Sequence, residues 1–357
     1  MKKISDIFVI RICLATLSFA VFVIAFTGIA PACLAIARIQ LTPRLLQCIA
    51  AATFGSILSL ALILLSALIL GRAYCSIVCP LGLFQDCIGF VSRKFSHQPK
   101  NLPWLRFAIA GFVFAALGFG FHSIVRTIDP YANAGRIFAS FLSGGFVSLA
   151  VIIVLALLYR RAFCSTICPV GTLLGLVSQF SFLKLRIDDG CAHCGLCARH
   201  CPTGAINVKS SSIDNEICVR CMECTSACPR GLIKFGVSRG KDASAKVDKS
   251  RREFLANSGM LAAGAVLGGL VAKSGLSTKS EKFGVATFDP TSCIVFQDDA
   301  QCGRCARACP SSAIELRANG TPKPPKPALC IGCGACQAAC PARPKAMRVI
   351  FRKMTSN

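Results

Sequence analysis

Cysteines restrict the possible folds of this chain more than any other feature of the sequence. The chain has 24 cysteines in 357 residues, and sixteen of them form four groups of four, three of which have the same short spacing. Small secreted domains with many disulfides are also rich in cysteine. This chain is too long for that class and, with 54% hydrophobic residues, too apolar. The spacing therefore indicates metal ligation.

The first two groups share the spacing Cys-x2-Cys-x2-Cys-x3-Cys-Pro, which is typical of bacterial ferredoxins with two [4Fe–4S] clusters. Three closely spaced cysteines surround one cluster, and the fourth reaches the other cluster. The predicted ligand sets are Cys191, Cys194, Cys197 and Cys228 for one cluster, and Cys218, Cys221, Cys224 and Cys201 for the other. Zinc is the alternative, but structural zinc usually uses pairs of ligands with longer spacers.

The other two groups are less regular, because Asp299 stands where the first cysteine of one run is expected. Cys293, farther upstream, is the natural replacement through a longer loop. The predicted sets are Cys330, Cys333, Cys336 and Cys309 for one cluster, and Cys293, Cys302, Cys305 and Cys340 for the other. Two alternatives for the last set are a [3Fe–4S] site with three cysteines, or Asp299 as the fourth ligand. We therefore expect four [4Fe–4S] clusters in two α+β ferredoxin domains.

Long apolar stretches fill much of the remaining chain, at residues 12–30, 45–70, 104–121, 144–158 and, less hydrophobic, 254–272. A membrane-spanning helix needs about 20 apolar residues. The expected fold is an α-helical membrane domain with four spanning helices and a fifth after the first ferredoxin domain; buried helices of a soluble core are the alternative. The expected domains are residues 1–180 for the membrane domain, 181–240 for the first ferredoxin, 241–280 for a linker with the fifth helix, and 281–357 for the second ferredoxin.

A repeat lies within the membrane half, where residues 71–82 read GRAYCSIVCPLG and residues 160–171 read RRAFCSTICPVG. Cys75 and Cys79, like Cys164 and Cys168, are four residues apart, which places each pair on one face of a helix before Pro80 or Pro169 breaks it. The two pairs are candidates for one four-thiolate site that holds another cluster, a metal ion or redox-active thiols. Simple packing of buried cysteines is the alternative.

Charge predicts the topology of the membrane domain. Lys2, Lys3 and Arg11 favour a cytoplasmic N-terminus, so the first ferredoxin is expected in the cytoplasm. Arg251 and Arg252 precede the fifth apolar stretch and resemble a twin-arginine export signature, which predicts a periplasmic second ferredoxin. The alternative is a short hydrophobic hairpin or a surface helix, either of which leaves both ferredoxins cytoplasmic. The net charge of +24 fits basic loops at a membrane better than nucleic-acid binding, because no basic patch is interleaved with aromatic residues.

The two Cys-x3-Cys-Pro motifs and the ferredoxin run that follows them resemble the NapH-type membrane polyferredoxins over about residues 1–237. The part from Arg251 to Cys340 resembles the NapG-type twin-arginine ferredoxins, although it has fewer cluster motifs. The resemblance implies an inner-membrane component of a quinol dehydrogenase system. Electrons would pass from the quinone pool through the clusters to a periplasmic acceptor such as a multihaem cytochrome or a reductase.

Quinol oxidation also requires a proton acceptor and, between ferredoxins on opposite membrane faces, an intermediate electron carrier. Asp129 and His122 are the candidates for the proton acceptor; Asp129 has the alternative role of capping a turn before Pro130. A bound quinone or a cluster at the paired cysteines is the candidate for the carrier. Two other functions remain open, namely an accessory redox protein for the maturation of a metalloenzyme and a membrane redox sensor.

Overall fold

The computed structural model describes residues 6–27, 40–51, 53–92, 97, 99, 102–119, 126–139, 145–237, 247–273, 284–297 and 301–350. These residues belong to two compact units. The first unit contains residues 1–19, 62–112 and 152–266, and the second contains residues 20–61, 113–151 and 267–357. Each unit therefore combines helical segments with one of the two cysteine-rich regions.

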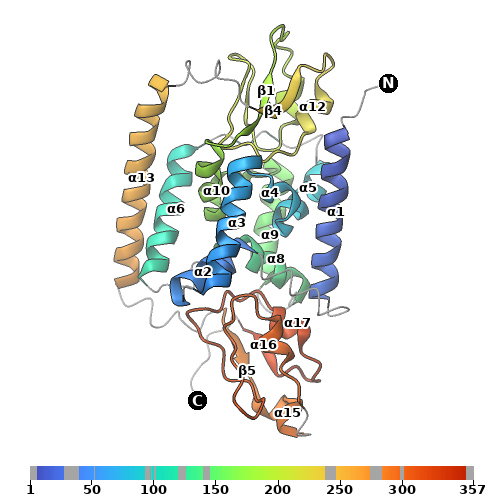
Figure 1. Cartoon of the computed structure of the whole chain (residues 1–357), viewed down its shortest axis with the longest axis vertical. Helices are drawn as coiled ribbons and strands as arrows, with labels where there is room; N and C mark the ends of the chain where they lie inside the picture. Colours follow the sequence, from blue (N-terminus) through green and yellow to red (C-terminus); the bar gives the residue numbers. More distant parts are fainter. Residues whose placement is uncertain are drawn as a thin grey trace. The chain divides into compact units, whose positions relative to one another are not determined.

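All five apolar stretches contain a helix (Figure 1). The helices are α1 (Asp6–Phe26), α2 (Leu41–Ala51), α3 (Phe54–Leu70), α6 (Pro103–Gly118), α9 (Gly145–Tyr159) and α13 (Val247–Lys273). Their sequences are rich in leucine, isoleucine, alanine and phenylalanine, and they lack the alternation of polar and apolar residues that a strand with one solvated face requires. The expectation of helices at these positions is therefore confirmed.

The number of membrane-spanning helices differs from the expected four or five. Among the described residues only α1 is both long and apolar enough to cross a membrane, and one such helix near an N-terminus is weak support because a signal sequence has the same properties. The stretch 45–70 is interrupted, since α2 ends at Ala51 and α3 begins at Phe54. The 17 residues of α3 span about 25 Å at 1.5 Å per residue, less than the hydrocarbon core of about 30 Å.

The first ferredoxin region, in the first unit, is built from short elements around two cysteine loops. Strands β1 (Leu183–Ile187) and β4 (Ile233–Val237) pair antiparallel, with Leu185 opposite Phe235. Strands β2 (Ile206–Asn207) and β3 (Ser212–Ile213) form a second short ladder, and the helices α11 (Leu196–His200) and α12 (Glu223–Ala227) each carry the third cysteine of a run. This is the α+β arrangement expected from the spacing.

The second ferredoxin region, in the second unit, repeats this plan with fewer strands. Strands β5 (Ala286–Phe288) and β6 (Met347–Val349) pair antiparallel. The short helices are α15 (Ile294–Gln297), α16 (Arg304–Ala308) and α17 (Ala335–Ala339). Cys309 and Cys336 lie in a small buried cluster with Ala313, Ile314 and Met347, so the apolar core of this region forms directly around the cysteines.

Four of these short helices begin with the same backbone conformation. The residue before each helix has a left-handed conformation, with φ of 72° at Gly195, 61° at Met222, 62° at Gly303 and 79° at Gly334. Glycine adopts this conformation at no steric cost, whereas Met222 does not. The four cysteine runs thus follow one backbone path, and Met222 shows that the path persists where the sequence lacks the glycine.

Helices α6 and α13 approach each other closely through glycine. A Cβ atom added to Gly264 would collide with the carbonyl oxygen of Ala108, and one added to Gly111 would collide with that of Leu261. Small residues that allow close contact between backbones are typical of helix pairs in membranes. Helix α13, which contains the fifth apolar stretch, therefore packs against a helix of the first apolar half.

We expect Gly264→Ala to destabilise the protein by about 1–3 kcal/mol, because the added methyl group overpacks a backbone contact. Gly259→Ala, on the same helix, is the matched control, since its Cβ would meet no atom within 4 Å. A helical glycine replaced by alanine without strain is stabilising by about 0.4–1 kcal/mol. Chemical unfolding in detergent measures both; equal effects of the two substitutions would contradict the contact.

Candidate iron–sulfur sites

The structure brings together the four cysteines of each predicted set in the first ferredoxin region. Cys191, Cys194, Cys197 and Cys228 line one cavity, and Cys201, Cys218, Cys221 and Cys224 line another. In both sets the fourth cysteine comes from the other run, as the exchange of ligands between two clusters requires. Ligation itself stays a prediction, but the tertiary arrangement has the form that the spacing predicts.

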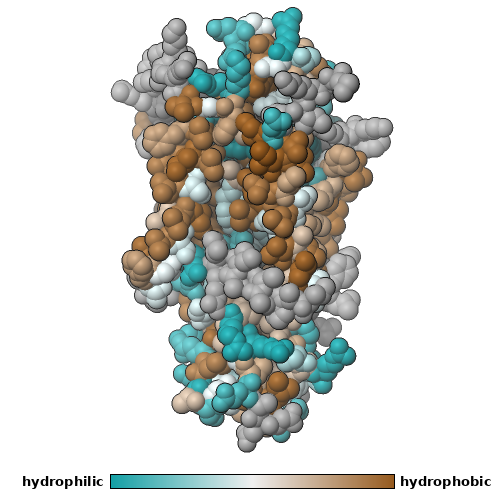
Figure 2. All heavy atoms as spheres, turned by 45° about the vertical axis from the view of Figure 1, so that its right-hand side comes forward, coloured by the Kyte–Doolittle hydropathy of each residue, from teal (hydrophilic) through white to brown (hydrophobic). Residues whose placement is uncertain are grey.

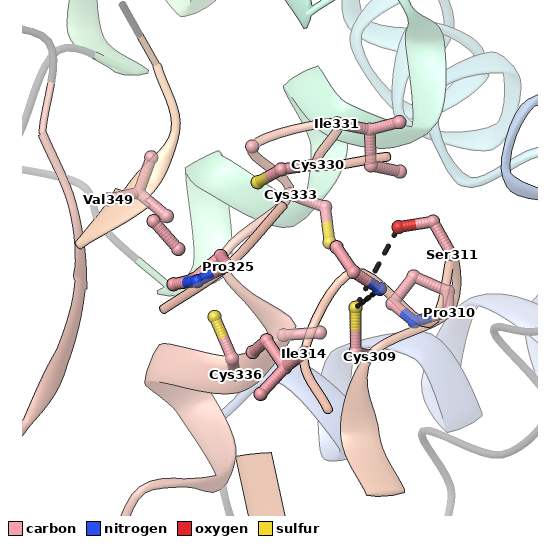
Figure 3. Close-up of a pocket in the computed structure, with 15 residues that line it drawn as sticks. Cys309, Pro310, Ser311, Ile314, Pro325, Cys330, Ile331, Cys333, Cys336 and Val349 are labelled. Carbon is pink, nitrogen blue, oxygen red and sulfur yellow. Dashed lines mark hydrogen bonds between the residues drawn. The ribbon is translucent and has the colours of Figure 1, made fainter. Parts of the chain in front are cut away.

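The second ferredoxin region has the same arrangement. Cys330, Cys333, Cys336 and Cys309 line one cavity, and Figure 3 shows their sulfur atoms turned toward a shared space. Cys293 lines the other cavity together with Cys302, Cys305 and Cys340, although it lies outside the regular run. This placement agrees with Cys293 as the replacement for the missing cysteine. Asp299, its alternative, lies outside the described residues.

The sulfur atoms are placed to accept hydrogen bonds from the main chain. The N–H of Ala205 donates to Cys201 Sγ at 3.3 Å, and the N–H of Ala313 donates to Cys309 Sγ at 3.2 Å. Hydrogen bonds to sulfur stabilise thiolate ligands and tune their clusters. Within the described ranges no three histidine, cysteine, aspartate or glutamate side chains lie close enough to hold one metal ion. The preference for a cluster over zinc therefore still rests on the spacing of the cysteine runs.

The two cavities of the first ferredoxin region differ in exposure. All four cysteines of the set around Cys218 are buried, whereas Cys194 is exposed and the other three of its set are partly exposed. His193 and His200, which flank ligands, donate through Nδ1 to the carbonyl oxygens of Val208 and Leu196. We therefore call the set of Cys191, Cys194, Cys197 and Cys228 the accessible set, and the set of Cys201, Cys218, Cys221 and Cys224 the enclosed set.

Buried arginines connect the enclosed set to the Cys-x3-Cys-Pro motifs within the first unit. The N–H of Arg161 donates to the carbonyl oxygen of Pro202 at 3.3 Å, and Arg160 donates to the carbonyl oxygen of His200 at 2.8 Å and pairs with Glu223 at 2.9 Å. Arg72 donates to the carbonyl oxygen of Glu216 at 3.0 Å. Both cysteine motifs are therefore hydrogen-bonded to the first ferredoxin region.

The two motifs are not continuous helices. Helix α4 (Tyr74–Ile77) carries Cys75 and ends before Cys79, which has an extended backbone and precedes Pro80 at the start of α5 (Pro80–Val91). In the second motif one π-helical segment (Phe163–Ile167) is followed by α10 (Pro169–Ser178) in the same way. Proline is favoured at the first position of a helix and removes no needed hydrogen bond there. Both prolines thus start new helices, and all four cysteines are buried.

Asp129, the candidate proton acceptor, is buried in the second unit, where it accepts hydrogen bonds from the Thr42 hydroxyl and, at 2.7 Å, from the N–H of Ala132. Its side chain therefore caps the start of α8 (Pro130–Ala139), which agrees with the capping role given above as the alternative to proton transfer. Burial raises the pKa of this carboxyl to about 6, although these hydrogen bonds lower it in part. A proton-accepting role stays a prediction, and His122 lies outside the described residues.

Sequence reasoning used the arginines only as charges for topology and missed their structural role. Arg126 of the second unit donates to the carbonyl oxygen of Cys330 at 2.8 Å, and Arg136 donates to that of Arg126 at 2.6 Å. In the first unit Arg72 and Arg161 are fully buried. The repeat contained one sign of this role, because Arg72 and Arg161 both stand three residues before the first cysteine of their repeat.

Two family models match the chain. One, described as a 4Fe-4S binding domain, matches residues 51–97 and 143–187; the other, described as a 4Fe-4S dicluster domain, matches residues 190–232, 217–313 and 300–344. The cysteine cavities and these matches define an iron–sulfur protein with two ferredoxin-type regions. No solved structure matches the chain.

Several curated proteins are similar to the chain, and two of the three described here have electron-transport or ferredoxin-type names. Uncharacterized protein MJ0749 of Methanocaldococcus jannaschii is 28% identical over 183 residues, which are 51% of this chain and 71% of that protein. Putative electron transport protein YccM of Escherichia coli is 27% identical over 184 residues, 47% of this chain and 52% of YccM. Ferredoxin-type protein NapH of Haemophilus influenzae is 25% identical over 157 residues, 42% of this chain and 55% of NapH.

The chain thus spans about half of the length of YccM and NapH. These matches support the NapH-type resemblance. The NapG-like character of the C-terminal part and its twin-arginine signal stay predictions.

Proposed function

We propose that this protein is a membrane-bound electron carrier that passes electrons from quinol through four [4Fe–4S] clusters to a periplasmic acceptor. The observation that carries the proposal is the arrangement of sixteen cysteines as four sets of four around four cavities. Cysteine-bound iron–sulfur clusters have reduction potentials over a wide range. They transfer single electrons without a further cofactor. The names of the similar proteins, which include electron transport and ferredoxin types, agree with this role.

Exposed apolar side chains support a membrane location. Leu17 of α1 is 63% exposed, Phe54 of α3 81%, and Val266 of α13 63%. Figure 2 shows such apolar residues gathered over the helical part of the chain. Large contiguous apolar surfaces are rare on soluble monomers and mark membrane or protein contacts. Helices α3, α6 and α9 are shorter than a typical span, so in this proposal the bilayer thins around them or their polar flanking side chains extend to the membrane surface.

The proposed route begins on the cytoplasmic side and ends in the periplasm. Each quinol releases two electrons and two protons to become quinone, and the clusters carry the electrons singly to an acceptor such as a multihaem cytochrome. The first ferredoxin would be cytoplasmic and the second periplasmic, with Arg251 and Arg252, near the start of α13, as the export signature. Since the hydrocarbon core is about 30 Å thick, a carrier between the ferredoxins is part of this route.

We expect a short-chain quinol to reduce the clusters in membranes that contain the full-length protein, with bleaching of the visible iron–sulfur absorbance. The control is the variant in which Cys191, Cys218, Cys302 and Cys330 are all replaced by serine, one ligand from each set. Reduction by dithionite in the same membranes shows that the clusters are present. Clusters that dithionite reduces but quinol leaves oxidised would overturn the quinol-linked function.

A further inference from the structure

The two Cys-x3-Cys-Pro motifs hold each other in a reciprocal contact within the first unit. Arg72 of the first motif donates to the carbonyl oxygen of Cys164 in the second motif at 3.0 Å. Arg161 of the second motif donates to the carbonyl oxygen of Cys75 in the first, also at 3.0 Å. The repeat therefore forms one structure with approximate twofold symmetry, in which each arginine reaches the first cysteine of the other motif.

Two glycines make this contact possible. A Cβ atom added to Gly82 would collide with the carbonyl oxygen of Cys75 and lie close to the guanidinium of Arg161. A Cβ atom added to Gly171, the equivalent position, would collide with the carbonyl oxygen of Cys164 and the guanidinium of Arg72. Both halves of the repeat therefore use an arginine, a cysteine carbonyl and a glycine in the same way.

The four thiols form one group. Their residues are 4–6% exposed, and the contacts of Arg72 and Arg161 with the carbonyl oxygens of Cys164 and Cys75 hold the two pairs next to each other. As in the four ferredoxin sets, no three of these thiols form a site for a single metal ion among the described residues. A cluster core holds its thiolates farther apart than one ion does, because Fe atoms and bridging sulfides lie between them. In this respect the group resembles the ferredoxin sets.

The charge around these thiols is positive. The three hydrogen bonds of Arg72 all go to main-chain carbonyl oxygens, and its Nε atom has no partner among the described residues. Asp86 is shared by Arg161 and Arg11, so two guanidinium groups face one carboxylate. Burying an uncompensated charge costs several kcal/mol. A cluster with four thiolates, which carries a net charge of about −2 in the oxidised [4Fe–4S] form, would compensate it.

We propose that Cys75, Cys79, Cys164 and Cys168 together hold a fifth iron–sulfur cluster, shared between the two repeats. A family model described as a 4Fe-4S binding domain matches each repeat separately, at residues 51–97 and 143–187, and one site shared by both repeats goes beyond that match. The cluster would neighbour the enclosed ferredoxin set, because Arg161 bonds both the carbonyl oxygen of Cys75 and, through its main-chain N–H, that of Pro202, which follows Cys201. It would accept one electron at a time and pass it to that set, with no bond made or broken.

Iron and sulfide analysis of the purified full-length protein tests this proposal. We expect the Cys75→Ser/Cys164→Ser variant to contain about four fewer irons per chain than the wild type for a [4Fe–4S] core, or about two fewer for a [2Fe–2S] core. Cys87→Ser is the matched control, since Cys87 is exposed on α5 and belongs to no set. Equal iron in all three proteins would overturn the proposal.

A second measurement uses the wild type alone, so it tests the proposal even if the variant fails to fold. In the wild type, reductive titration should take up about five electrons per chain if all centres are one-electron carriers, and about four without the fifth cluster. An uptake of four, with four clusters present, would overturn the proposal. The proposed quinol reaction is tested separately, since dithionite serves as the reductant here and neither readout depends on quinol.

Discussion

Asp86→Asn should lower the free energy of unfolding by about 3–5 kcal/mol, the typical effect of leaving a buried charge without its partner. Asp86 binds Arg161 through both oxygens at 2.5 and 2.6 Å, and Arg161 is fully buried. Asparagine keeps the shape of the side chain but not its charge. The guanidinium of Arg161 would remain in the interior and, among the described residues, would keep its hydrogen bond to the carbonyl oxygen of Cys75 but no anionic hydrogen-bond partner.

Glu315→Gln is the matched control for this substitution. Glu315 also pairs with two cations, Lys323 and Lys326, but all three side chains are exposed, and exposed ion pairs add little to stability. Unfolding by denaturant, followed by the loss of cluster absorbance, measures both variants. A similar midpoint for Asp86→Asn and Glu315→Gln would contradict the structural role of the buried pair.

The same ion pair predicts a dependence on pH. Burial alone would raise the pKa of Asp86, but the neighbouring guanidinium groups of Arg161 and Arg11 hold it below its ordinary value. A carboxyl with a lowered pKa in the folded state stabilises the fold above its unfolded pKa of about 3.9. That stabilisation is fully present at neutral pH and is lost as the pH falls below about 4. The variant should lack this acid-dependent contribution.

The ligand sets could be predicted from the sequence because they are encoded locally. Each run of cysteines lies within a dozen residues, and its spacing fixes which sulfur atoms one loop can turn toward a cluster. Even Cys293 could be assigned, since the incomplete run needed a replacement and the chain offered one upstream. The structure places it in the cavity with Cys302, Cys305 and Cys340.

The contacts between segments could not be predicted in this way. Arg72 and Cys164 are 92 positions apart, and neither their spacing nor their residue types indicate a hydrogen bond. The interruption between α2 and α3 was also missed, because residues 45–70 are apolar throughout and hydropathy does not report where a helix ends. Such features depend on tertiary packing, which a periodic pattern in one segment does not contain.

The fourth cysteine of each run lines the cavity of the other run, and this exchange predicts which cluster is lost when that cysteine is replaced. Cys201 follows the run of Cys191, Cys194 and Cys197 in the chain, yet it lines the cavity of Cys218, Cys221 and Cys224. We therefore expect Cys201→Ser to remove the enclosed cluster and to leave the accessible one, with a loss of about four irons per chain. Cys228→Ser should do the reverse, because Cys228 lines the cavity of Cys191 and its neighbours.

The different exposure of the two cavities makes these outcomes distinguishable. A hydrophilic oxidant should bleach the cluster near Cys194 first, because Cys194 is exposed, while the set around Cys218 is buried. The rapidly bleached fraction should therefore persist in Cys201→Ser and disappear in Cys228→Ser, with Cys13→Ser, an exposed cysteine of α1, as the unchanged control. If Cys201→Ser instead lost the rapidly bleached fraction, as Cys197→Ser should, each run would bind its own cluster. The exchange of ligands between the runs would then be wrong.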